Sequence, residues 1–95
     1  MNKEKYLLLC LIEECNEIEH RACKAIRFGL NEKQPGQDKT NAQRLHDEIN
    51  DLMGVISLLN QQFDFKYEPS VQAMQDKQKR LEKYYRYSKS KGESK

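Results

Sequence analysis

Residues 3–28 read KEKYLLLCLIEECNEIEHRACKAIRF, and this stretch decides the fold. Apolar side chains recur in it at alternating spacings of three and four, which is the period of one face of an α-helix. Gly29 follows directly, and glycine commonly ends helices because it tolerates the left-handed conformation. We therefore predict a long amphipathic helix over residues 3–28. Its predicted apolar stripe consists of Leu8, Leu11, Cys15, Ile18, Ala22 and Ala25.

A second helix follows a predicted loop. Residues 31–39 contain the turn dipeptide Pro35-Gly36 and no aliphatic or aromatic residue, which is typical of a loop. Thr40 and Gln43 have the spacing of a capping box, in which each side chain bonds the backbone N–H of the other residue. The helix that they open should end between residues 62 and 65. Its apolar stripe consists of Leu45, Ile49, Leu52, Ile56, Leu59 and Phe63.

The third segment begins at Pro69, with Ser70 placed to cap a helix. Val71, Met74, Leu81 and either Tyr84 or Tyr85 form a weaker stripe, and we find neither strand-like alternation nor an internal repeat. We predict an all-α protein built from an antiparallel helical hairpin and a third helix. Residues 1–87 would form its single domain, and the low-complexity stretch 88–95 a disordered basic tail.

The composition indicates a chain with a narrow core. It has 95 residues, of which 37% are hydrophobic and 34% charged. Short polar domains often gain stability by associating with copies of themselves. We therefore expect oligomerisation, as a homodimer or a homotetramer, to complete a helical bundle.

Several sequence features suggest a cytoplasmic protein. No apolar run reaches the 18 residues that a membrane span requires. Charges bracket the short apolar run at residues 7–12, so we do not expect a signal peptide. Cys10, Cys15 and Cys23 lack the Cys-x-x-Cys spacing of a zinc site, and we expect buried, reduced thiols.

Two pairs of acids carry the functional argument. Glu14 and Glu17 are three residues apart on the first predicted helix, and Glu48 and Asp51 are three apart on the second. Helical geometry places the members of each pair about 60° and 120° from the centre of its stripe, in the same rotational sense. In an antiparallel hairpin, both pairs then emerge on one side.

Four carboxylates that converge in this way repel one another strongly unless cations neutralise them. Ligand sets made of oxygen alone favour Mg²⁺ first, with Mn²⁺ or Ca²⁺ next. The sequence therefore predicts a magnesium site that could also accept manganese. An ordinary solvated acidic face is the alternative explanation for either pair taken alone.

Several segments together resemble a known family. They are EECNEI at 13–18, KAIRFG at 24–29, QPGQ at 34–37, TNAQRL at 40–45 and EINDL at 48–52. The pattern of Glu-x-x-Glu followed by Glu-x-x-Asp is similar to that of the MazG-like all-alpha nucleotide pyrophosphohydrolases, above all their short single-domain phage and bacterial versions. The resemblance covers about residues 5–59. The gap between the acid pairs is longer than is usual in that family, and the loop around Pro35 accounts for the extra length.

The resemblance implies a magnesium-dependent hydrolase. It would convert nucleoside triphosphates to monophosphates and pyrophosphate by water attack on the alpha phosphorus. Glu13 matches an extra acid that precedes the family motif, and would orient a ligand or the water. The implied metal ligands are Glu14, Glu17, Glu48 and Asp51.

Three further residues are candidates for binding substrate. Lys24 lies two turns after Glu17 on nearly the same face, and Arg27 one turn further, so both could reach a triphosphate. Ordinary surface charge explains them equally well. Asn41 could bond the base or sugar, or instead assist the start of the second helix.

Two other functions remain open from the sequence. The fold could bind nucleotide or metal without turnover. Alternatively, residues 77–95, where basic side chains alternate with tyrosines, could stack on single-stranded nucleic acid. A helix end that frays into solvent explains this region more simply, and a net charge of +2 is small for a nucleic-acid-binding protein. Nucleic acid is therefore not expected as a partner.

Overall fold

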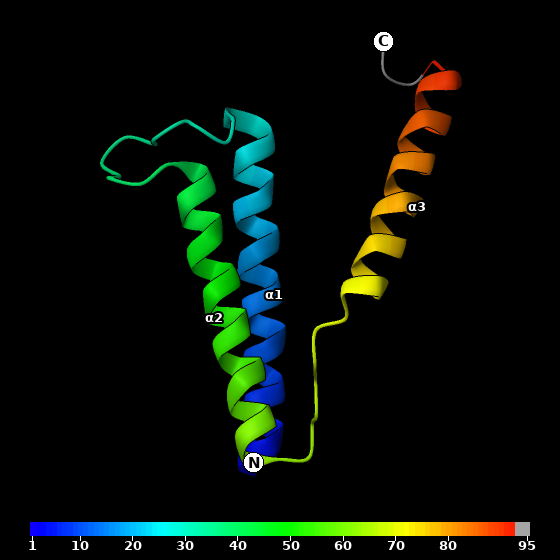
Figure 1. The fold of residues 1–95 in the computed structure, drawn as a ribbon. Coiled ribbons are helices and arrows are strands. Elements are labelled where there is room, and N and C mark those ends of the chain that lie inside the picture. Colours follow the sequence, from blue (N-terminus) through cyan, green and yellow to red (C-terminus); the bar gives the residue numbers. More distant parts are fainter. Residues whose placement is uncertain (93–95) are drawn as a thin grey trace.

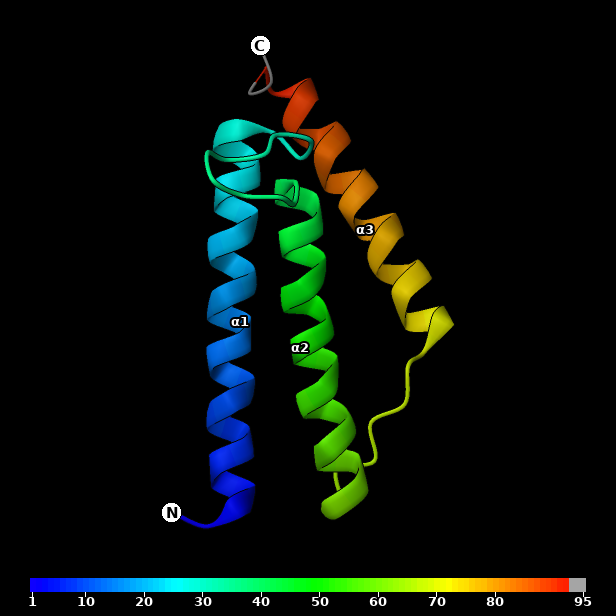
Figure 2. The same cartoon turned by 90° about the vertical axis from the view of Figure 1, so that its left-hand side faces the viewer.

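The computed structural model describes residues 1–92, and these residues form three α-helices without any strand. The helices are α1 (Lys3–Phe28), α2 (Asn41–Gln62) and α3 (Val71–Ser90). The first two run antiparallel and lie side by side as a hairpin (Figures 1 and 2). The predicted all-α class and the predicted hairpin are confirmed.

Local capping explains where the helices begin and end. At the start of α2, the backbone N–H of Gln43 donates to Thr40 Oγ1 at 3.1 Å, and that of Thr40 donates to Gln43 Oε1 at 2.8 Å. This is the predicted capping box. Ser70 caps α3 by accepting from the backbone N–H of Ala73 at 3.1 Å. Gly29 ends α1 with a φ of 93°, a conformation that other residues rarely adopt.

The two hairpin helices pack through a different line of α1 from the one predicted. Leu7 is buried and Leu8 is exposed, whereas the predicted stripe ran through Leu8 and Cys15. The predicted stripe is rotated by about 40–50°, because Leu11, Ile18, Ala22 and Ala25 are half-buried as predicted while Leu7 and Glu14 replace Leu8 and Cys15. The reason is that residues 7–9 are three successive leucines, so two neighbouring lines of α1 are both apolar there. The contact line passes through Leu7, Leu11, Glu14, Ile18 and Ala25, all buried or half-buried.

This rotation also overturns the expectation of buried thiols. Cys15 and Cys23 are exposed and Cys10 is half-buried, and all three are free thiols. Cys15 belonged to the predicted stripe, and it turns away from α2 together with Leu8. On α2 the prediction was closer, because Leu59 is buried and Leu45, Leu52, Ile56 and Phe63 are half-buried, with Ile49 exposed.

Helix α3 makes no contact with α1 or α2 within the part of the chain that the structure describes. Figure 1 shows it standing apart from the hairpin at the end of an extended linker. No side chain of its predicted stripe is buried by the hairpin, and Val71 and Leu81 remain 67% and 52% exposed.

Part of the predicted tail is helical. Residues 88–90, predicted to be disordered, continue α3 to Ser90. Two bonds to the carbonyl oxygen of Tyr87 explain the extension: Ser90 Oγ donates at 2.8 Å and the backbone N–H of Lys91 at 3.1 Å. Gly92, with a φ of 77°, then ends the helix. The rest of the predicted tail, residues 93–95, lies outside the described residues.

Among residues 1–92, no helix has both the length and the apolar character that a membrane crossing demands.

Candidate metal centre

Three of the four predicted ligands meet between the hairpin helices. Glu14, Glu48 and Asp51 each offer a carboxylate oxygen, and these oxygens all lie within 4.8 Å of one another. Glu14 and Glu48 are half-buried, while Asp51 is exposed one turn after Glu48. Adjacent oxygens around an octahedral Mg²⁺ ion lie about 3 Å apart, because each lies about 2.0–2.1 Å from the metal. A small closure of the three side chains would therefore complete one face of such an octahedron.

Glu17 is not part of this group of three. It follows Glu14 by nearly one turn of α1, on the same edge of the hairpin as Asp51, and it is exposed. Glu13 lies on that edge as well, and both glutamates act electrostatically on Glu14. The centre thus consists of three close acids and two neighbouring ones.

Glu14 has the most perturbed environment of the group. Its removal from water raises the pKa of its carboxyl, and Asp51, Glu48, Glu17 and Glu13 raise the pKa further by repulsion. Its Oε2 is buried and has no hydrogen-bond partner. A buried oxygen without a partner destabilises a fold, and a charged one more so. A divalent cation would supply both the missing partner and the missing positive charge.

The metal-free protein should therefore gain stability from Glu14→Gln. Because the pKa of Glu14 is higher in the folded than in the unfolded chain, ionised Glu14 destabilises the fold at neutral pH. This destabilisation is relieved as the pH falls through the raised pKa. With chelator at pH 7.5, we expect the variant to unfold a few degrees higher than the parent, and the difference to shrink on acidification. Calorimetry against pH measures this, with Asp38→Asn in the exposed loop as the control; an unchanged difference would contradict it.

Lys24 and Arg27, the two cations predicted to bind the triphosphate, lie near the C-terminal end of α1. Lys24 Nζ is 5.9 Å and Arg27 Cζ 5.2 Å from the ring centroid of Phe28. Lys24 lies on the same edge of the hairpin as Glu17 and can extend along it. Arg27 lies about 140° around α1 from Glu14, so it points away from the acids.

Sequence reasoning missed Arg21. This residue follows Glu14 by seven positions, or two turns, so it lies on nearly the same line of α1. Its side chain is half-buried, and its Nε is buried without a hydrogen-bond partner. The seven-residue spacing from Glu14 could have placed Arg21 near the site. It could do so only once Glu14 was known to face α2.

Asn41 holds the loop against the start of α2. Its residue surface is only 2% exposed, and its Nδ2 donates to the carbonyl oxygen of Gly29 at 2.8 Å and to Glu32 Oε1 at 3.2 Å. Its own backbone N–H donates to the carbonyl oxygen of Glu32 at 2.9 Å. These contacts agree with the structural role considered for Asn41, and they occupy the amide that a base or sugar would need.

Asn41→Ala should therefore destabilise the protein by about 1–3 kcal/mol, because the Gly29 carbonyl loses its buried partner. Urea unfolding at constant protein and magnesium concentration measures the change. A matched variant on the exposed surface of α2, Asn50→Ala, removes an amide that is not buried and should cost less. Unchanged stability for Asn41→Ala, with an effect on nucleotide binding alone, would return Asn41 to the substrate site.

No protein-family model matches this chain, and it has no match among curated proteins or among solved structures.

Proposed function

We propose that the protein is a magnesium-dependent nucleoside triphosphate pyrophosphohydrolase. One observation carries this proposal: Glu14, Glu48 and Asp51 converge between two helices, with a buried oxygen of Glu14 left without a partner. Such an oxygen-only cluster suits Mg²⁺, which commonly bridges carboxylates and substrate phosphates. The resemblance of the same acids to the MazG-like motif supports the choice of reaction, with Mn²⁺ as a second competent ion.

Each side chain then has a definite task. Glu14, Glu48 and Asp51 would hold the ion, and Glu17 would reach it from the adjoining turn. An ion bound there would neutralise phosphate oxygens and lower the pKa of water. Glu13 accepts a hydrogen bond from the attacking water and orients it toward the alpha phosphorus. The water oxygen bonds to the alpha phosphorus and releases a proton to solvent. The bond between this phosphorus and the oxygen that bridges to the beta phosphorus breaks, and pyrophosphate leaves.

Cationic side chains along the hairpin balance the remaining phosphate charge. Arg21 lies on the line of Glu14, with its Nε buried and without a partner. Lys24 lies on the exposed edge of the same helix, three residues further on. We assign both to the triphosphate, and leave Arg27 as a surface cation.

A panel of ribo- and deoxyribonucleoside triphosphates, incubated with the purified protein and Mg²⁺, tests the proposal. At least one substrate should give equal amounts of monophosphate and pyrophosphate. Release of orthophosphate and diphosphate instead would place the attack at the gamma phosphorus and contradict the proposal.

The position of Glu17 favours a second candidate, a nucleotide- or metal-binding module without turnover. Glu17 lies outside the group of three close acids, so the ligand set that turnover requires is incomplete without a side-chain movement. Calorimetry would then show nucleotide binding with Mg²⁺, while no product forms over hours at high protein concentration.

A further inference from the structure

The hairpin has an apolar face on the side opposite the acids. In an antiparallel pair of helices, the residues that directly follow a contact-line residue in sequence point to one side of the hairpin on both helices. The residues that directly precede a contact-line residue point to the other side. Glu13, Glu17 and Asp51 belong to the second side. On the first side Ile12 is 57% exposed and Ile26 is 83% exposed. We define the apolar face as Leu8, Ile12, Cys15, Ala22 and Ile26 of α1 with Ile49, Met53 and Ile56 of α2, and the polar residues Glu19 and His46 lie on the same side.

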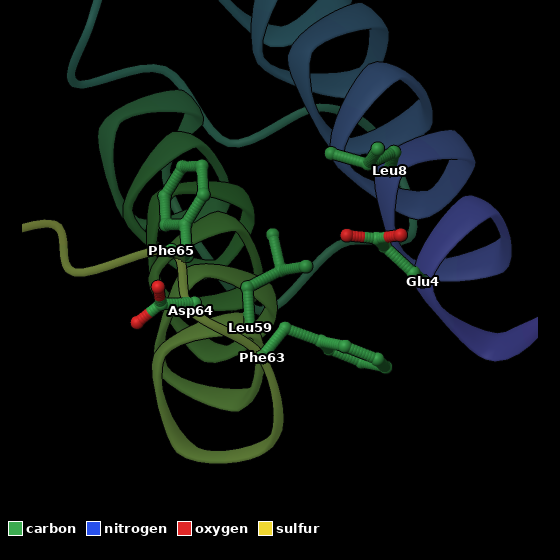
Figure 3. Close-up of a pocket in the computed structure, with 6 residues that line it drawn as sticks. All are labelled: Glu4, Leu8, Leu59, Phe63, Asp64 and Phe65. Atoms are coloured by element: carbon green, nitrogen blue, oxygen red, sulfur yellow. The ribbon is translucent and has the colours of Figure 1, made fainter.

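The linker leaves the hairpin across this face. A pocket of about 310 Å³ lies at its open end, where Phe65 of the linker lines the cavity together with Leu8 and Leu59. Figure 3 shows these side chains around the cavity, with Phe63 beside Leu59. Helix α3 then rises beside the hairpin without touching it (Figure 1).

Two hydrogen bonds hold the linker against the end of α2. Asn60 Nδ2 donates to the carbonyl oxygen of Tyr67 at 2.9 Å, and the backbone N–H of Tyr67 donates to Asn60 Oδ1 at 2.9 Å. These two bonds tie the linker to the last turns of α2. Beyond this point the chain continues to α3, which makes no contact with α1 or α2 of its own chain in the described residues.

The single chain exposes too much surface for a protein of its size. Its accessible surface is 7696 Å², whereas a folded monomer of 11.3 kDa should expose about 5,700 Å². The surplus of roughly 2,000 Å² is what each partner of an obligate homodimer buries. The radius of gyration of 17.0 Å, against about 12 Å for a compact domain of this length, agrees with an open arrangement.

The net charges of the helices favour the packing of α3 against a hairpin over the packing of α3 against a second α3. Helix α3 carries six basic and two acidic residues, a net charge of +4. In α1 five basic residues balance five acidic ones, while α2 has one basic and three acidic residues, a net charge of −2. Two α3 helices would therefore repel each other, whereas neither hairpin helix carries a net positive charge.

We propose that two copies of this chain exchange their α3 helices, each α3 lying on the apolar face of the other copy's hairpin. The interface is then isologous, with the same surfaces used twice. Val71, Met74, Leu81 and Tyr85 of one copy cover Ile12, Ile49 and Met53 of the other. The metal centre stays open on the far side of each hairpin. This arrangement stands independently of the reaction assigned to that centre.

Light scattering on the full chain tests the association. We expect a molar mass at least twice the chain's 11.3 kDa at micromolar concentration. Leu81→Lys should raise the dissociation constant tenfold or more, since buried apolar anchors dominate interfaces. Gln72→Lys is the matched control, because it lies about 180° around α3 from Leu81. The parent chain found as a monomer, or equal effects of both variants, would overturn the proposal.

Crosslinking tests the exchange itself. In one tagged chain Cys15 is the only cysteine. A second chain with a different tag lacks the native cysteines and carries Met74→Cys. The two chains are coexpressed and treated with a short bis-maleimide. We expect a crosslinked pair that carries both tags, at several times the yield obtained when Cys10 replaces Cys15 as the only thiol. Cys10 lies about 140° around α1 from Cys15. In a further experiment one chain carries both Cys15 and Met74→Cys. A product crosslinked only within that chain would show that α3 folds back on its own hairpin, and would refute the exchange.

Discussion

Glutamine in place of Glu48 is expected to lower pyrophosphate release by a hundredfold or more. Glu48 is the half-buried member of the second acid pair and lies within 4.8 Å of both other close ligands. Loss of a side chain that merely supports a metal ligand typically costs 10–100-fold in activity or metal affinity. Loss of a ligand itself should cost at least as much. The rate of pyrophosphate release at saturating Mg²⁺ measures the effect.

The control for this experiment is Glu68→Gln, which removes an exposed carboxylate of the linker and should leave the rate unchanged. Circular dichroism must show that both variants keep the helix content of the parent. A Glu48→Gln protein that turns over as fast as the parent would remove the acid cluster from the mechanism. A parent that binds nucleotide but releases nothing would favour the silent binding module.

Magnesium is expected to raise the midpoint of thermal unfolding by roughly 10 °C or more at a hundred times its dissociation constant. A ligand that binds only the folded state at this excess stabilises it by about 2.7 kcal/mol. In a domain of this length each kcal/mol moves the midpoint by roughly 4–8 °C. Relief of the repulsion that raises the pKa of Glu14 should lower the dissociation constant of the ion, so that less magnesium gives the same shift. Manganese should act similarly.

Two controls make the magnesium result specific. Sodium chloride at equal ionic strength separates binding from simple screening of surface charge, and chelator should reverse the shift. Glu14→Ala should remove most of the magnesium effect, whereas Asp38→Asn should not. If magnesium leaves the parent's unfolding midpoint unchanged, the three acids do not form a metal site.

Helix boundaries were predictable because the signals that set them are local. Thr40, Gln43 and Ser70 bond backbone groups within three residues of themselves, so a short window of sequence contains the whole interaction. The same holds for Gly29, whose backbone conformation few other residues adopt. The end of α3 was less predictable, because residues 88–90 alternate serine, a weaker helix former, with lysine, a better one.

The convergence of Glu14, Glu48 and Asp51 was predictable, but the line of α1 that brings Glu14 against α2 was not. The spacing of the two acid pairs in an antiparallel hairpin was enough to place them on one side. Which line of α1 faces α2 was not, because Leu7 and Leu8 offer two adjacent apolar lines that differ by one residue. That choice decides the burial of Glu14, the exposure of Cys15 and the position of Arg21.

By itself, the sequence determined three helices, their caps and an acid pattern that favours a divalent cation, since each depends on neighbours within a turn or two. Only the tertiary structure decided that the hairpin contact line runs through Glu14 and that α3 stands off an apolar face. Both depend on contacts between residues far apart in the chain. Local periodicity gives the angle of a side chain on its own helix, and packing alone decides what that side chain meets.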